Sequence, residues 1–141
     1  MKVVIDTNVV VSANLSDEGP SAAILDLAAN RMILMCISPA VIAEYEAVLR
    51  RPRLKLDPSR IASSLAVIRN TSRLVRPTRR LTEAEDEPDN RFLECAAFAG
   101  ADFIITGNAR HFPQRFENIR IVTPREFLDL ITPTPELAGN R

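Results

Sequence analysis

The sequence predicts an α/β domain in which a parallel β-sheet is covered by helices on both faces. Short apolar runs of strand length alternate along the chain with longer segments of helical spacing. These runs are apolar throughout, which is typical of strands buried on both faces. Polar residues follow the ends of two of the runs, where parallel sheets usually bind ligands. We therefore expect a central parallel sheet of four to five strands flanked by helices.

The strands are expected at five apolar runs. The third is the weakest, because "RLVRP" contains two arginines and ends at a proline. The apolar run Val9–Val11, which follows the first strand closely, is interpreted as further core. The runs are, in chain order, residues 2–6, 32–37, 73–77, 102–106 and 119–123.

Helices are expected between these strands because recognisable start and stop signals frame them. Ser38 can cap a helix that has Pro39 at its first position, and Asp57 with Pro58 repeats that opening. Gly100 is a typical helix end. The helical segments are residues 20–30, 38–51, 57–72, 86–100 and 124–131. Right-handed crossovers then bring the carboxyl ends of all the parallel strands to one edge of the sheet.

The length of 141 residues suits one domain, which we place at residues 1–131, with a flexible tail at 132–141. There is no apolar run near twenty residues, and the start "MKVVID" lacks the plan of a signal peptide. We therefore expect a cytoplasmic protein with no membrane partner. Cys36 and Cys95 are far apart and are expected to be buried, reduced thiols.

The formal net charge of zero hides a strong asymmetry. Residues 47–82 contain ten basic residues and the single acid Asp57, so this segment carries +9 and the rest of the chain −9. Sixteen of the eighteen basic residues are arginine, which suits bidentate phosphate contacts. The basic segment either forms solvated helix faces whose charges pair across the fold, or attracts a polyanion or an acidic protein partner.

Several acidic and amide residues are expected near the sheet edge that the carboxyl ends of the parallel strands share. Asp6 ends the first strand, and Asn108 follows the strand at 102–106. Asp89 lies in the first turn of its predicted helix and projects near the centre of that helix's apolar stripe, unless it is only an N-cap. Glu44 and Glu46 flank the stripe of the helix after Ser38 symmetrically, so spacing does not choose between them. Four further acids look like loop and cap material: Glu83, Glu85, Asp86 and Glu87.

Carboxylates that converge would either take up protons or bind a cation. Two unit charges about 4 Å apart repel by roughly 4 kcal/mol at an effective dielectric constant near 20. A cluster of carboxylates without His or Cys selects Mg²⁺, or Mn²⁺ as a substitute, over Zn²⁺. Such a centre is suited to metal-assisted hydrolysis of phosphodiesters.

Several stretches resemble the PIN (PilT N-terminus) domain family over nearly the whole chain. They are "VVIDTNVVVSA", "SPAVIAEYEAVL", "DEPDNRFLECAAFAGADFIITGNARHF" and "IVTPREFL". The chain looks most similar to the toxin branch of toxin–antitoxin pairs, relatives of VapC-type ribonucleases. The resemblance implies a three-layer, Rossmann-like PIN fold, an Mg²⁺-dependent RNA-cleaving site, an antitoxin protein partner and a homodimer.

The family's site residues carry over onto four positions of this sequence. They are Asp6, Glu44, Asp89 and Asn108, of which Asp6, Asp89 and Glu44 would bind metal. The carry-over prefers Glu44 to Glu46. At the third position the alignment could be shifted by one residue to Asn90, but Asp89 is favoured because it has the carboxylate and the central position on the helix stripe. The fourth position is commonly Asp, so Asn108 removes one negative charge and favours one bound metal over two. Supporting residues around the ligands would be Thr7, Asn8, Ser38 and Thr106, and RNA contacts would be Arg50, Arg51, Arg53, Arg110 and His111.

Other phosphate-handling classes fit less well. Haloacid-dehalogenase-type phosphatases need an acid where this chain has Asn8, response-regulator receivers need a late lysine, and no glycines cluster into a phosphate-binding loop. The alternative that stays open is a PIN fold without catalysis that binds RNA or an antitoxin-like protein, and Asn108 is the residue that favours it.

Overall fold

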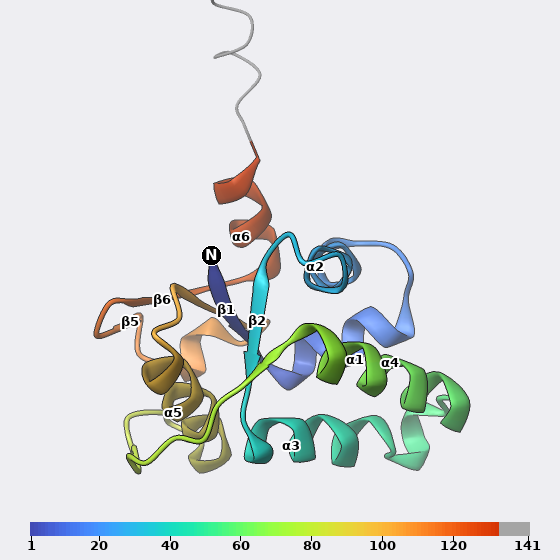
Figure 1. The fold of residues 1–141 in the computed structure, drawn as a ribbon, viewed down its shortest axis with the longest axis horizontal. Helices are drawn as coiled ribbons and strands as arrows, with labels where there is room; N and C mark the ends of the chain where they lie inside the picture. Colours follow the sequence, from blue (N-terminus) through green and yellow to red (C-terminus); the bar gives the residue numbers. More distant parts are fainter. Residues whose placement is uncertain (133–141) are drawn as a thin grey trace, which may run out of the picture.

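The structure, a computed structural model, describes residues 1–132 and contains one six-stranded sheet with helices packed on both faces (Figure 1). The tail expected at 132–141 lies, apart from Thr132, outside the described residues. The α/β class predicted from the alternating apolar runs is therefore confirmed. Five strands are parallel, and one short edge strand is antiparallel to its neighbour.

The strands follow the order β3-β2-β1-β4-β6-β5 across the sheet. Their bounds are β1 Lys2–Ile5, β2 Leu34–Ile37, β3 Arg73–Leu74, β4 Phe103–Ile105, β5 Arg115–Phe116 and β6 Ile119–Val122. The sixth strand, β5, was not expected, because two residues are too short to show any periodicity. It forms a tight hairpin with β6 through Glu117, whose φ of 54° is in the left-handed region.

Residues 1–132 contain six α-helices, of which the last follows the final strand, and α5 lies on the other side of the sheet from α1, α2 and α4 (Figure 1). The helices are α1 Thr7–Leu15, α2 Pro20–Ala29, α3 Pro39–Leu49, α4 Pro58–Thr71, α5 Asn90–Ala99 and α6 Pro124–Ile131. Three short 3₁₀ turns are η1 Pro52–Leu54, η2 Glu87–Asp89 and η3 Ala109–His111. None of the helices within residues 1–132 is long and apolar enough to cross a membrane.

Val9 and Val10 belong to the buried core, as the apolar run predicts, but the run forms a helix, α1, which was not expected. Consecutive β-branched residues favour strands, and their run hides the helical period. The helix forms because Asp6 caps it: the Asp6 side chain accepts a hydrogen bond from the Thr7 N–H. Val9 and Val10 are then buried against the sheet. Cys36 and Cys95 are buried free thiols, as expected.

The register of the sheet brings the ends of two strands together at the predicted edge. Ile5 of β1 pairs with Ile105 of β4, and Ile105 pairs with Val122 of β6. β1 lies at the point where the strand order reverses, since β2 is on one side of it and β4 on the other. Asp6 and Thr106, the residues that follow β1 and β4, therefore meet at this switch point, where α/β sheets bind ligands.

Candidate metal centre

A cleft of about 530 Å³ opens at the carboxyl ends of β1 and β4. It combines four acids, two arginines, a histidine, two amides and a threonine from segments that are far apart in the sequence. Its polar and charged lining residues are Asp6, Thr7, Asn8, Glu44, Arg51, Arg53, Asp86, Asp89, Asn108 and His111. The structure thus brings together all four residues that the family resemblance assigned to the site.

Asp6 is the most firmly held carboxylate of the cleft. The Thr106 hydroxyl donates to Asp6 Oδ2 at 2.7 Å, and the Thr7 N–H donates to Oδ1 at 2.8 Å. Each carboxylate oxygen keeps a free lone pair for a further ligand. Burial raises the pKa of the Asp6 carboxyl and the charge of Glu44 raises it further, although the hydrogen bonds from Thr106 and Thr7 partly oppose this.

Glu44, and not Glu46, reaches the cleft. Its carboxylate accepts a hydrogen bond from the Thr7 hydroxyl, which joins α3 to the start of α1. The next residue, Tyr45, is completely buried and donates its hydroxyl to the Ile5 carbonyl, so α3 is anchored at the end of β1. Glu46 instead pairs with Arg50 at 3.0 Å and Arg69 at 3.6 Å. The sequence signal for Tyr45 was only its place on the apolar stripe.

Asp89 lines the cleft from the start of α5, where η2 leads into the helix. It occupies the N-cap position but its side chain makes no capping hydrogen bond, so the interpretation as a simple cap is not supported. Partial burial raises the pKa of Asp89 to about 6, and the negative charges of Asp6, Asp86 and Glu44 contribute. Asn90 is buried, and its side chain binds Ala84 and Glu87 instead of lining the cleft.

Asp86 and His111 add a group that the sequence interpretation missed. One ligand atom from each of Asp86, Asp89 and His111 lies within 4.8 Å of the others. The side chain of Asp86 is 66% exposed, and its carboxylate lies 3.7 Å from His111 Nδ1. The acidic run at 83–87 looked like an ordinary solvated loop, and only the backbone bond from the Glu85 N–H to the His111 carbonyl places it beside η3.

The remaining supporting residues divide into two groups. Asn8 accepts a hydrogen bond from the Gly107 N–H at 3.0 Å, and Thr106 accepts one from the Asn108 N–H at 3.0 Å, so both order the loop after β4. Asn108 itself is exposed and its side chain makes no hydrogen bond within residues 1–132. Ser38 is buried, caps α3 by accepting from the Val41 N–H, and does not line the cleft.

The basic segment is divided between paired and free arginines. Five of its ten basic residues form ion pairs with acids elsewhere, namely Arg50, Arg60, Arg69, Arg79 and Arg80. Arg51 and Arg53 form no ion pair within the described chain and line the cleft. Arg110 is exposed on η3 but, like Arg50, is not among the lining residues.

The donor set fits a hard divalent cation. The carboxylates of Asp6, Glu44 and Asp89 supply oxygen ligands, and Asn108 can add an amide oxygen. Burial, and to a smaller extent their mutual repulsion, raises the pKa values of Asp6 and Asp89, and a bound cation would favour their charged forms.

Comparisons with known proteins agree with this fold. The chain is 30% identical over 141 residues to the uncharacterised protein MJ1680 of Methanocaldococcus jannaschii, and the match covers 92% of this chain and 90% of that protein. The fold of this chain is similar to that in the crystal structure of VapBC2 from Rickettsia felis bound to a DNA fragment from their promoter. That similarity has a TM-score of 0.60 and 17% identity over 87% of this chain and 98% of the other. The family model described as the PIN domain matches residues 2–110, and the chain therefore belongs to the PIN domain family.

Proposed function

We propose that this PIN domain is an Mg²⁺-dependent endoribonuclease that hydrolyses RNA phosphodiester bonds, with Mn²⁺ as a possible substitute. The observation that carries the proposal is the cleft, where Asp6, Glu44 and Asp89 from three separate elements face Arg51 and Arg53. Acids that attract a cation beside arginines that attract phosphate form a site for a polyanionic substrate.

Each residue has a role in this proposal. Asp6 and Asp89 hold the cation, and Glu44 either binds it as well or orients the attacking water. Asn108 completes the ligand set, and Arg51 with Arg53 binds the phosphates of the RNA strand. When bound, Mg²⁺ supplies Lewis acidity, which polarises a phosphate oxygen and makes water a stronger acid. Thr7 and Thr106 orient Glu44 and Asp6 through the hydrogen bonds described above.

We also propose that the protein is the toxin of a toxin–antitoxin pair, with an antitoxin protein as its partner. The motifs resemble VapC-type ribonucleases, and the fold is similar to that of VapBC2. The homodimer that the resemblance implies stays a prediction, which the molar mass in solution would test.

The experiment is cleavage of a mixed pool of structured and single-stranded RNA with Mg²⁺, with Mn²⁺ and with EDTA. Wild type and Asp6→Asn are purified side by side, so that a contaminating nuclease shows in both. Metal-dependent cutting by the wild type alone is expected, because the substitution removes a ligand charge but keeps the shape. Equal cutting by both proteins would contradict the site assignment.

A second candidate function is a module that binds RNA or an antitoxin-like protein without cutting. Asn108 favours it, because the amide supplies no charge where many family members have Asp. RNA binding without metal-dependent cutting by the wild type would support this candidate. If the missing charge is the cause, Asn108→Asp should then tighten Mn²⁺ binding and create cleavage.

A further inference from the structure

A segment without regular structure, residues 75–86, runs from the end of β3 along α5 and ends at Asp86 in the cleft. Segments of about this length without regular structure are uncommon inside a compact domain. Leu81 and Ala84 of this segment are only 5% and 8% exposed. Their backbone N–H groups are therefore shielded from water and need acceptors within the protein.

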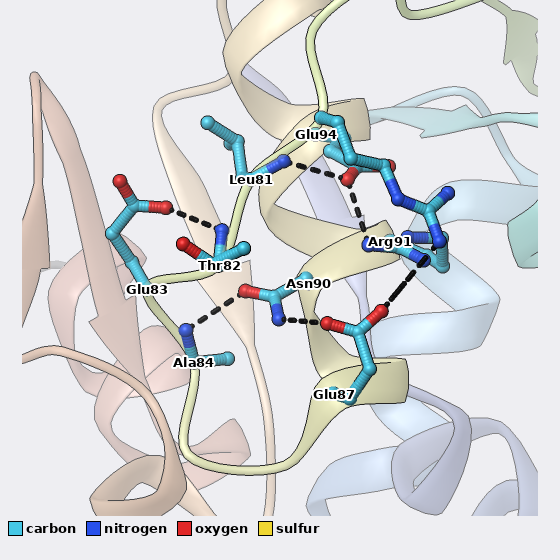
Figure 2. Close-up of polar contacts among 9 residues, drawn as sticks. Leu81, Thr82, Glu83, Ala84, Glu87, Asn90, Arg91 and Glu94 are labelled. Carbon is cyan, nitrogen blue, oxygen red and sulfur yellow. Dashed lines mark hydrogen bonds and ion pairs between the residues drawn. The ribbon is translucent and has the colours of Figure 1, made fainter.

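Two side chains of α5 supply those acceptors (Figure 2). The Leu81 N–H donates to Glu94 Oε2 at 2.9 Å, and the Ala84 N–H donates to Asn90 Oδ1 at 2.8 Å. Asn90 and Glu94 are four residues apart and so share one face of the helix. They take the place that a neighbouring strand would have in a sheet, and they dock the segment on α5.

Asn90 makes a second contact that brackets Asp86. Its amide Nδ2 donates to Glu87 Oε2 at 2.9 Å, and Arg91 pairs with the other oxygen of Glu87 at 2.9 Å (Figure 2). Ala84 lies two residues before Asp86, and Glu87 is the residue after it. The single side chain of Asn90 therefore contacts the chain on both sides of Asp86, at the Ala84 backbone before it and at the Glu87 side chain after it.

We infer that Asn90 is a positioning residue of the metal centre: it fixes the turn that presents Asp86 and Asp89 to the cation without touching the cation itself. This inference rests on the proposed function, because it assumes that the cleft binds a divalent ion. Both polar groups of the Asn90 side chain are occupied by Ala84 and Glu87, so it has a task other than ligation. Without it, the Ala84 N–H would be buried with no acceptor, and the turn would be free to move.

The first test is a titration of the RNA-free protein with Mn²⁺, in which electron paramagnetic resonance measures how much of the Mn²⁺ is bound. Asn90→Ala should weaken Mn²⁺ binding by about 10–100-fold, the usual range for residues that orient metal ligands. Asn14→Ala is the matched control, since Asn14 is also buried with two side-chain hydrogen bonds but lies away from the cleft. It should lower the melting temperature and leave the Mn²⁺ affinity unchanged.

A second pair of variants keeps the test decisive if Asn90→Ala does not fold. Glu87 is 61% exposed, so Glu87→Ala should fold, and it removes the acceptor of Asn90. We expect it to weaken Mn²⁺ binding several-fold and to speed hydrogen exchange at residues 81–86. Glu87→Gln keeps an acceptor oxygen but not the charge, and it should restore both properties.

The outcomes separate this inference from the function on which it rests. Suppose that Asn90→Ala binds Mn²⁺ as tightly as the wild type does, or that Glu87→Ala does so when Asn90→Ala is unfolded. This result would overturn the positioning role and leave the proposed function standing. No Mn²⁺ binding by the wild type would overturn both. Weakened binding in Asn14→Ala to the same degree would also overturn the inference, because the effect would then come from general destabilisation.

Discussion

The two sides of the cleft are built differently. On the sheet side, Asp6 and Glu44 each accept a hydrogen bond from a threonine, and Tyr45 anchors α3 to the end of β1. On the loop side, Asp86 and Asn108 are exposed, and only Asp89 is partly buried. The backbone and Asn90, more than contacts of the ligand side chains themselves, hold the loop side in place.

This difference indicates which of the proposed ligands would be ordered before a cation or RNA binds. A carboxylate with fixed hydrogen bonds loses little freedom on binding a metal, whereas an exposed one must be ordered at that moment. We expect the sheet side to determine whether the cation binds. The loop side should tune how tightly it binds and how its binding depends on pH.

The largest effect is expected on the sheet side. Glu44→Gln should lower cleavage by more than about 100-fold, because even residues that only orient a ligand cost 10–100-fold. Glu46→Gln is the matched control, since Glu46 lies two residues away on the same helix but pairs with exposed arginines. Losing those pairs should cost less than about 1 kcal/mol in the free energy of unfolding and leave cleavage unchanged. Similar cleavage rates for both variants would remove Glu44 from the site.

An intermediate effect is expected from the pH dependence of the loop side. The pKa of Asp89 is about 6 in the folded protein and about 3.9 when unfolded, so its charged form disfavours folding. The protonated Asp89 carboxyl makes its full contribution to the free energy of unfolding below about pH 4, and this contribution is lost as the pH rises through 6. After allowance for the half-exposed carboxyl, Asp89→Asn should stabilise the metal-free protein by about 1 kcal/mol at pH 7.5.

Denaturant unfolding of both proteins at pH 4 and pH 7.5 measures this difference. The gap between wild type and Asp89→Asn should close at pH 4. Saturating Mg²⁺ should reverse its sign at pH 7.5, because only the wild type keeps the ligand. An Asp89→Asn protein that is less stable than the wild type at pH 7.5 without metal would contradict the raised pKa.

The smallest effect is expected at the rim of the cleft. Replacing Arg51 and Arg53 together with glutamine should reduce the salt slope of RNA binding by about 1.4, because each lost contact to single-stranded RNA contributes about 0.7. The double variant of Arg50 and Arg110, which do not line the cleft, removes the same charge and is the control. Equal slopes for the two double variants would mean that the whole basic segment, and not the rim, attracts RNA.

Much of this site could be predicted because it depends on strand ends. Apolar runs identify parallel strands, and parallel strands share one carboxyl edge, so Asp6 and the Thr106–Asn108 loop had to lie together. Helical spacing left Glu44 and Glu46 equivalent. The choice between them depends on the Thr7 and Tyr45 contacts of α3, which are tertiary and have no local signal.

The parts that could not be predicted depend on long-range contacts or on misleading local patterns. Asp86 belongs to an acidic loop that looks solvated, and only its docking on α5 and η3 brings it to the cleft. Helix α1 was hidden because its valines have strand propensity and the Asp6 cap was read only as a ligand. The pairing of three arginines with acids far away in the sequence could not be read from composition either: Arg60 with Asp17, Arg69 with Glu46 and Arg79 with Glu117.

The central claim is that Asp6 and Asp89 hold one cation between the two sides of the cleft. Anomalous scattering from a crystal soaked in Mn²⁺ tests it directly. The account predicts one peak in the cleft within about 2.1 Å of a carboxylate oxygen of each of these residues. A peak held by Asp86 and His111 without Asp6, or a cleft with no peak at saturating Mn²⁺, would contradict it.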